Sequence, residues 1–217
     1  MKPRALIADI LGLSPVMPVV TIEDAASAPD LARALVRGGI GAIEVTLRTP
    51  QALRAIEAIA SGVPEICVGV GTVMSPEDLT LAENAGAAFA ISPGATRELL
   101  AAGADLRIPY LPAVATASEL MTAMAAGYRH FKLFPANAAG GVAALKGFHG
   151  PFPEARFCPT GGVSLQTAPD YLKLPNVLCV GGSWLAPDDA LKARDWDRIE
   201  KLAREAAALT RAAKAAH

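Results

Sequence analysis

Short apolar segments alternate with alanine-rich helical segments along this chain, and this rhythm constrains the fold more than any other feature. Glycine or proline stands at many of the boundaries between segments. Helical windows lie at 27–37, 50–60, 76–84, 95–102 and 117–126. Strands and helices that take turns in this way are typical of a parallel sheet covered by helices. Eight strands are predicted, at 16–22, 42–47, 66–70, 88–92, 106–111, 129–134, 156–159 and 177–180.

Eight such units favour closure of the sheet. The predicted fold class is α/β, a single (β/α)8 TIM barrel domain over residues 1–217 with a short N-terminal helix. The weakest parts are 137–153, where four glycines obscure any helix, and the start of the seventh strand, so an open doubly wound sheet is the alternative. Residues 211–217 are the one stretch that reads as disordered. A last helix is predicted from helical spacing of Ile199, Leu202, Ala206 and Leu209.

Composition and charge indicate which kinds of molecule this chain could bind. The chain has 217 residues, 52% of them hydrophobic, and 20 basic against 21 acidic side chains, which suits one well-cored domain. No basic cluster indicates nucleic acid, and no apolar run reaches the ~18 residues that span a bilayer, so we expect a cytoplasmic protein with a small-molecule partner. The three cysteines, far apart, read as core residues, and the three histidines show no ligand spacing. We therefore expect no metal and no cofactor.

Lys132 is the centre of the functional reading. In the predicted strand at 129–134, it shares one face with His130 and Phe134, and Pro135 ends the run. Burial disfavours the charged form of a lysine, and a neutral amine is a nucleophile. The alternative is a strand-end lysine whose ammonium reaches water, and the residue alone does not decide between the two.

The strand at 42–47 supplies a carboxylate. Alternation places Glu44 on the face toward the barrel interior, where it either forms a structural ion pair with Arg48 or Lys132 or moves protons beside Lys132. Arg48 follows the strand and is either a solvated loop residue or a ligand for a planar carboxylate. Thr72 offers a hydroxyl at the end of the next strand, after Gly71.

Glycine-rich turns follow the last two predicted strands. In a barrel these two strand ends form the usual phosphate site, because glycine exposes backbone N–H groups and helix N-termini attract anions. The alternative is a pair of tight turns in which glycine supplies unusual backbone angles. Neither turn contains Lys or Arg, so recognition of an anion would rest on backbone dipoles. The candidate phosphate residues are Thr160, Gly161, Gly162, Gly182 and Ser183.

These motifs occur together and in one order, and the chain resembles the 2-keto-3-deoxy-6-phosphogluconate (KDPG) aldolase and 4-hydroxy-2-oxoglutarate (KHG) aldolase family over nearly its full length. The motifs that carry the resemblance are Glu44-Val45-Thr46-Leu47-Arg48, Gly71-Thr72, Ile91-Ser92-Pro93-Gly94, Phe131-Lys132-Leu133-Phe134-Pro135-Ala136, Pro159-Thr160-Gly161-Gly162 and Gly181-Gly182-Ser183-Trp184.

The resemblance implies a class I, metal-independent aldolase with a (β/α)8 barrel, commonly a homotrimer. It implies that Lys132 forms the Schiff base, Glu44 is the acid/base, and Arg48 and Thr72 bind the pyruvate carboxylate. The turns with Gly161, Gly162 and Ser183 would then hold the phosphate of the substrate.

Two other functions remain open from the residues: a phosphosugar isomerase without a covalent lysine, and a non-catalytic protein that binds phosphorylated ligands. The physiological substrate is also open among the gluconate epimer, the galactonate epimer and an unphosphorylated 4-hydroxy-2-oxo acid. One departure from the family pattern is Ala113, where glycine is usual, and we expect it to reshape the rim near the fifth strand.

Overall fold

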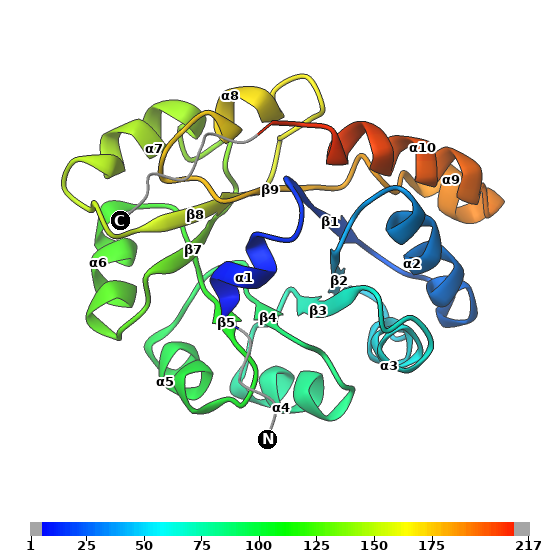
Figure 1. Cartoon of the computed structure of the whole chain (residues 1–217). Helices are drawn as coiled ribbons and strands as arrows, with labels where there is room; N and C mark the ends of the chain where they lie inside the picture. The colour runs from blue at the N-terminus through cyan, green and yellow to red at the C-terminus, as the bar shows by residue number, and fades with distance from the viewer. Residues whose placement is uncertain (1–5, 211–217) are drawn as a thin grey trace.

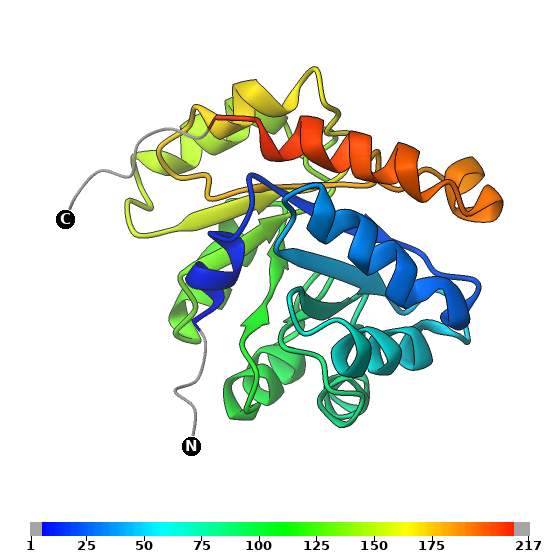
Figure 2. The ribbon, with the colours of Figure 1, turned by 45° about the vertical axis from the view of Figure 1, so that its right-hand side comes forward.

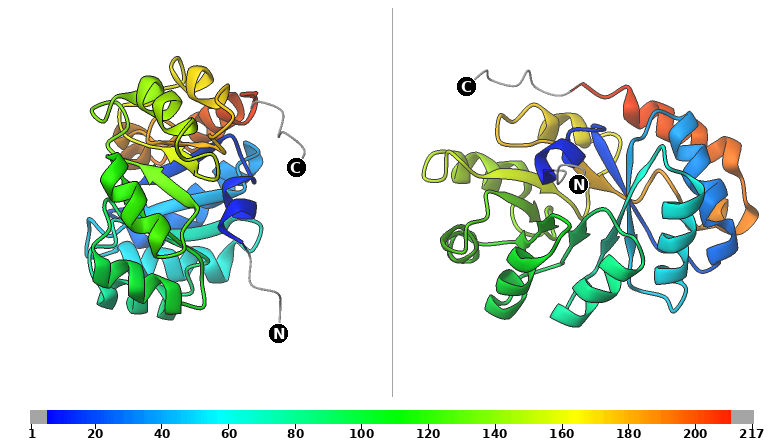
Figure 3. Two further views of the ribbon diagram at one scale, coloured as in Figure 1. Left: turned by 90° about the vertical axis from the view of Figure 1, so that its left-hand side faces the viewer. Right: turned by 60° about the horizontal axis from the view of Figure 1, so that its bottom comes forward.

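Parallel strands at the centre of the molecule are surrounded by helices, as a computed structural model of the chain shows (Figure 1). The structure describes residues 6–210. The predicted α/β class with parallel strands is confirmed. Figure 3 shows that the helices lie on the outside of the curved strand layer, whereas α1 (Ile7–Leu11) lies across one end of it.

The strands are short, and most are fully buried. Their bounds are β1 (Val16–Val20), β2 (Ala42–Thr46), β3 (Cys67–Gly71), β4 (Ala90–Ile91), β5 (Tyr110–Leu111), β6 (Ala113–Val114), β7 (His130–Leu133), β8 (Arg156–Pro159) and β9 (Val180–Gly182).

The helices alternate with these strands along the chain. After α1, they are η1 (Ala25–Ser27), α2 (Ala28–Arg37), α3 (Ala52–Gly62), α4 (Pro76–Asn84), α5 (Arg97–Asp105), α6 (Ala117–Ala125), α7 (Gly141–His149), α8 (Ala168–Leu172), α9 (Asp188–Ala193) and α10 (Trp196–Ala207).

Strand pairing in residues 6–210 forms two parallel sheets. Six strands pair in the order β5-β4-β3-β2-β1-β9, and three pair as β6-β7-β8. Isolated parallel bridges join Phe157 to Val177 and Thr160 to Gly181, beside β8 and β9. The sheet is therefore curled and parallel, and its closure into a complete eight-stranded barrel stays a prediction.

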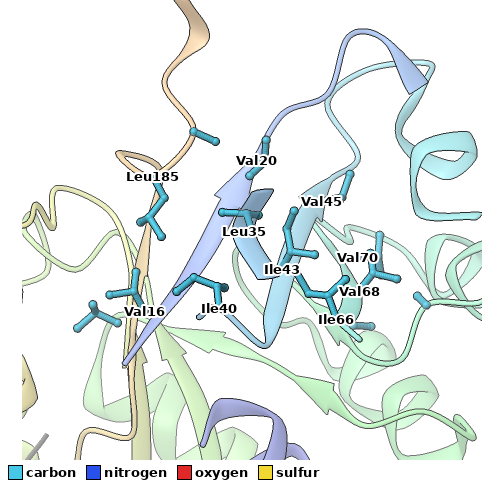
Figure 4. Packing of buried hydrophobic residues seen from close by; sticks show 14 of the residues in the cluster. Val16, Val20, Leu35, Ile40, Ile43, Val45, Ile66, Val68, Val70 and Leu185 are labelled. Carbon is cyan, nitrogen blue, oxygen red and sulfur yellow. The ribbon is translucent and has the colours of Figure 1, made fainter. Parts of the chain in front are cut away.

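Two apolar clusters lie on the two faces of the strands. The outer cluster packs the strands against the helices and includes Ile43 and Val45 (Figure 4). The inner cluster includes Ala42, Phe89 and Leu11 of α1, and is thus covered by α1 at one end. Neighbouring residues of β2 belong to opposite clusters, because successive side chains of a strand point to opposite faces. The inward assignment of Glu44 follows from the same alternation.

Three predicted segments differ clearly from the observed ones. The eighth strand was expected at 177–180, but β9 spans Val180–Gly182 and shares one residue with that range. The fifth strand was expected at 106–111, but the chain is extended only in β5 and β6, which flank Pro112; proline has no N–H to donate to a sheet. In the glycine-rich segment at 137–153, α7 is a regular helix. It begins after Gly140, whose φ of 96° lies in the left-handed region that glycine tolerates. Gly141 and Gly147 lie within α7, so two glycines of low helix propensity had obscured a helix that nevertheless forms.

The last helix, α10, packs against α2, and Figure 2 shows the two helices side by side in red and blue. Ile199 and Ala206 of α10 are fully buried, as predicted, while Leu202 is half-buried. Leu209 lies beyond the end of α10 and packs against the outer cluster. The expectation of disorder at 211–217 falls outside the described residues.

The cysteines are free thiols; Cys158 and Cys179 are buried in the inner cluster and Cys67 is half-buried beside it. Burial raises the pKa of the Cys67 thiol to about 11, which keeps it protonated at neutral pH. Among residues 6–210, no helix is long and apolar enough to cross a membrane.

Gly69 of β3 makes room for the Phe89 ring, because a Cβ at Gly69 would clash with that ring. We expect Gly69→Ala to lower the free energy of unfolding by about 1–3 kcal/mol, the usual cost of overpacking. Phe89→Leu, introduced second, should reduce that cost. Urea unfolding measures both, and Gly94→Ala is the matched control because its Cβ would meet nothing within 4 Å. Equal effects of the two alanine variants would contradict the packing assignment.

Candidate active site

The functional side chains lie at or near the carboxyl ends of parallel strands. Glu44 is in β2 and Lys132 in β7, two strands that belong to different sheets. Both side chains are buried: Lys132 is 5% exposed and Glu44 is 1% exposed. The curvature of the sheets brings together residues 88 positions apart in the chain.

Lys132 and Glu44 form a buried ion pair. Lys132 Nζ donates to Glu44 Oε1 at 2.8 Å and to Oε2 at 3.1 Å. The ammonium also lies 5.4 Å from the centroid of the Phe134 ring, within the range of a cation–π contact. Of the readings left open by the sequence, this geometry excludes the solvent-exposed lysine, and it pairs Glu44 with Lys132 and not with Arg48. A proton can pass between the two groups through a single hydrogen bond.

Gly71 leaves the space that the Glu44 side chain occupies. In the β2–β3 register Glu44 pairs with Gly69, and Gly71 pairs with Thr46. A Cβ at Gly71 would clash with Glu44 Oε1. Glycine at this position therefore serves the placement of the carboxylate. Gly69 and Gly71 were interpreted as glycines that permit close approach of backbone to a ligand, whereas here they admit a phenylalanine ring and a carboxylate.

Arg48 and Thr72 meet at the ends of β2 and β3. Arg48 Nε donates to Thr72 Oγ1 at 3.3 Å, and Arg48 is exposed. Thr72 has a φ of 60°, a left-handed conformation that residues with a branched Cβ rarely adopt. Such strain persists only where the surroundings hold it, and it is frequent at ligand sites.

The two glycine-rich turns line one cavity of about 440 Å³. Gly161 and Gly162 have φ values of 101° and 79°, so their turn requires glycine. A Cβ at Gly181 would clash with Thr160 Oγ1, which explains how the two turns lie so close together. The cavity is also lined by Arg48, and thus extends from the turns toward the end of β2. The expected residues that line it are Arg48, Thr160, Gly161, Gly162, Gly182 and Ser183.

Phe134 connects this cavity to the ion pair. Its ring lines the cavity, and the centroid of that ring is 5.4 Å from Lys132 Nζ, so the lysine lies close to the cavity wall. Glu44, Lys132 and Thr72 do not themselves line the cavity, and Thr72 reaches it only through its hydrogen bond to Arg48. The structure thus brings all the expected site residues into one region, in two connected parts.

Sequence reasoning missed several residues of the cavity wall as functional candidates, among them Phe134, Trp184 and Thr21. Phe134 carried a signal, since it is two residues after Lys132 on the same strand face. Trp184 follows the second turn; its ring packs on Gly182, and its indole Nε1 is buried without a hydrogen-bond partner among residues 6–210. Thr21, whose hydroxyl lies 3.0 Å from that of Thr46, carried no signal because the β1 end has no motif.

Ser92 joins two strand ends without lining the cavity. It is fully buried, and its hydroxyl lies 2.5 Å from the hydroxyl of Tyr110. Burial raises the pKa of Tyr110, so the phenol stays protonated. Ala113, the departure from the family pattern, pairs with Lys132 in the β6–β7 register and is also buried. It therefore lies beside the lysine strand and not at an exposed rim.

Taken together, the buried amine can act as a nucleophile, the carboxylate beside it as an acid or base, and the glycine turns as an anion site. The fold and this site define a class of α/β protein with a lysine–carboxylate centre at the carboxyl ends of parallel strands. The comparisons with known proteins specify the family. Residues 7–202 match the family model described as KDPG and KHG aldolase, and the chain belongs to this family.

Two curated relatives are 54% identical to the chain. One is the 2-dehydro-3-deoxy-phosphogluconate aldolase of Pseudoalteromonas atlantica, aligned over 92% of this chain and 93% of the relative. The other is the KHG/KDPG aldolase of Escherichia coli K12, aligned over 91% and 92%. A similar solved structure is the KDPG aldolase of Legionella pneumophila, with pyruvate captured as a covalent carbinolamine intermediate. It has a TM-score of 0.91 and 48% identity, and the match covers 93% of this chain and 98% of that one.

Removing one partner of the buried pair should be costly. Lys132→Met leaves the Glu44 carboxylate buried without its cation, and we expect the free energy of unfolding to fall by about 3–5 kcal/mol. The double variant Lys132→Met/Glu44→Leu should recover most of this loss, because no buried charge remains. Urea unfolding measures both.

The control for this prediction is Arg33→Met, which breaks an exposed ion pair with Asp30 whose side chains are 50% and 56% exposed. Exposed pairs contribute little, so this variant should hardly change stability. If Lys132→Met costs no more than Arg33→Met, the buried pair is not the electrostatic constraint described above.

Proposed function

We propose that this protein is a class I aldolase that cleaves 2-keto-3-deoxy-6-phosphogluconate to pyruvate and glyceraldehyde 3-phosphate. The observation that carries the proposal is the buried Lys132–Glu44 pair, 2.8 Å apart, close to a cavity that the two glycine turns line. The names of the curated relatives support the same activity. A covalent pyruvate intermediate in the Legionella enzyme supports the lysine chemistry.

The first half of the reaction makes the electron sink. Lys132 Nζ transfers a proton to Glu44, and the neutral amine attacks the C2 ketone of the substrate. The carbinolamine that forms loses its hydroxyl group as water, with the proton supplied by Glu44. The product is an iminium between Lys132 and C2, which withdraws electrons from C3.

The second half breaks the carbon–carbon bond. Glu44, directly or through one water, takes the proton of the C4 hydroxyl; the C3–C4 bond breaks, and its electron pair moves toward the iminium. Glyceraldehyde 3-phosphate leaves, and pyruvate remains on Lys132 as an enamine. A proton returned to C3 restores the iminium, and hydrolysis then frees pyruvate and the amine.

Arg48 and Thr72 are the proposed ligands of the pyruvate carboxylate. An arginine can bind a carboxylate through two parallel N–H bonds, which lysine cannot match. The hydrogen bond between Arg48 and Thr72 supports this role, because it orients the guanidinium group at the cavity wall. A fixed carboxylate keeps C2 aligned with the amine, and positioning of this kind contributes several kcal/mol, within the ~7–11 kcal/mol limit of intramolecular reactions.

The glycine turns are the proposed phosphate site, with Thr160, Gly161, Gly162, Gly182 and Ser183 as its residues. Positive φ values at Gly161 and Gly162 turn backbone N–H groups to one side, and both turns line the same cavity. The cavity residues include no cation other than Arg48, which supports recognition by backbone dipoles and by the Ser183 hydroxyl. We propose no metal and no cofactor for the reaction.

The substrate range is also part of the proposal. We propose that the chain cleaves 4-hydroxy-2-oxoglutarate to pyruvate and glyoxylate as well, since the E. coli relative is named for both substrates. The buried Ala113 beside Lys132 is the residue most expected to alter aldehyde preference. Specificity constants for the gluconate epimer, the galactonate epimer and 4-hydroxy-2-oxoglutarate would rank the three.

We propose further that the two sheets close into one (β/α)8 barrel that forms a single domain over residues 1–217. Closure is supported by the parallel bridge between Thr160 and Gly181 and by the direct succession of β5 and β6 around Pro112. A cytoplasmic location is proposed because Cys67, Cys158 and Cys179 are free thiols, which are usual in a reducing compartment.

A homotrimer is the proposed assembly. Large apolar side chains are exposed at Met74 (71%) and Met121 (61%), which supports burial of some surface between copies. Light scattering of the purified protein during gel filtration should give three times the mass of one chain. A mass equal to one chain at micromolar concentration would contradict the trimer.

Borohydride reduction in the presence of pyruvate should trap the Schiff base. We expect a reduced pyruvyl adduct on the peptide that contains Lys132, identified by mass spectrometry, because the iminium is converted to a stable amine. The peptide with the exposed Lys146 of α7 is the internal control and should stay unmodified. An unmodified Lys132 at saturating pyruvate would refute the aldolase and leave the isomerase and the binding protein as the alternatives.

Glu44→Gln should lower turnover by about 10²–10⁴-fold, the range for loss of a general acid or base, because the amide cannot shuttle the proton. Steady-state release of pyruvate measures this effect. Glu57→Gln, an exposed change on α3, is the matched control and should keep normal turnover. If Glu44→Gln folds and turns over normally, Glu44 is a structural partner of Lys132 and nothing more.

A further inference from the structure

A second cavity of about 450 Å³ is lined in part by Gly162. Of its lining residues, only Gly162 also lines the cavity described above. It is formed by the start of α7, by the chain just before that helix, and by residues at and before α8. No step of the proposed reaction uses these residues.

The first turn of α7 presents free donors to this cavity. The helix has nine residues, and the residue before it, Gly140, has no side chain that could cap it. Val142 and Ala143 line the cavity, and their N–H groups donate to no acceptor among residues 6–210. Unpaired N–H groups at a helix N-terminus carry a partial positive charge and favour an anion.

Tyr171 of α8 is a second and independent indication of a ligand. Its side chain is buried, with only 6% of the residue exposed, and it lines the same cavity. Within residues 6–210 no hydrogen bond from this hydroxyl to the protein is found, and the hydroxyl is not among the fully buried polar atoms, so a ligand in the cavity can reach it. Gly141, with a φ of 56°, lies close beneath this hydroxyl, and a Cβ there would approach it to 2.9 Å. The hydroxyl therefore stays accessible from the cavity.

Charge limits the kind of anion. No Lys or Arg lines the cavity, whereas the Asp170 carboxylate does, 3.4 Å from Lys173 Nζ. Burial raises the pKa of Tyr171, so its hydroxyl remains a donor at neutral pH. A compact oxyanion can accept bonds from the helix N–H groups and the phenol, while a hydroxyl on the same ligand or a water can donate to Asp170.

We propose that this cavity, formed by the N-terminus of α7 and the hydroxyl of Tyr171, is a second anion site that binds a phosphate group. The group is either free phosphate or the phosphate of a small hydroxylated ester. The site is distinct from the proposed substrate phosphate site, because the two cavities share only Gly162 among their lining residues.

Titration of the full chain with inorganic phosphate, at constant ionic strength maintained with chloride, tests the proposal. The amide resonances of Val142 and Ala143 should shift and saturate. Tyr171→Phe removes one hydrogen bond and should weaken this binding by about three- to tenfold. The resonances of Gly182 and Ser183 should respond as in the unmodified protein.

Two further variants keep the test decisive if Tyr171→Phe folds poorly. Asp170→Asn removes the opposing charge and should tighten binding at Val142 and Ala143. Ser183→Ala should leave binding at these amides unchanged. A parallel titration with glycerol phosphate separates the sources: tighter binding than inorganic phosphate indicates the ester.

The proposal is overturned if the Val142 and Ala143 resonances do not saturate with phosphate. It is also overturned if they follow the Gly182 and Ser183 resonances in every variant, because a single site would then explain all the shifts. The outcome does not depend on aldolase activity, so a failure here leaves the Schiff-base test unaffected.

Discussion

The buried ion pair between Lys132 and Glu44 is the interaction on which the rest of the site depends. Two charges in the apolar interior of the curled sheets are tolerable only when each satisfies the other, and here one ammonium bonds to both oxygens of one carboxylate. The two residues come from different sheets, so the pair exists only when β2 and β7 have the right curvature and register. The same closeness allows a proton to move between them, which a nucleophilic amine requires.

Glycine provides the room for this arrangement at the most crowded positions. A Cβ at Gly71 would collide with Glu44, and a Cβ at Gly181 would collide with Thr160. Removal of a side chain at these places lets two strands or turns approach while a functional group points between them. The packing of the interior therefore also determines where the Glu44 carboxylate and the two glycine turns lie.

Gly162 lines two cavities of similar volume, one with Phe134 in its wall and the other with Tyr171. Glycines and side chains with hydroxyl groups line both cavities, whereas Arg48 is the single cationic residue among their lining residues. Backbone dipoles can attract an anion without an added charged side chain. Such recognition is compatible with the nearly balanced charge of this protein. The two cavities differ in their acidic residues, since Asp170 lines one and Asp188 the other.

The sequence by itself determined the α/β class, most strand positions, the inward face of Glu44 and the family, because periodicity and ordered motifs are local properties of the chain. It did not determine which cation meets Glu44, how β5 and β6 divide around Pro112, or that Phe134 and Trp184 line the cavity. Nor did it indicate the cavity at Tyr171. These features were decided by the tertiary structure, because each depends on the distance between segments far apart in the sequence, and that distance is set by how the sheets curve and the helices pack.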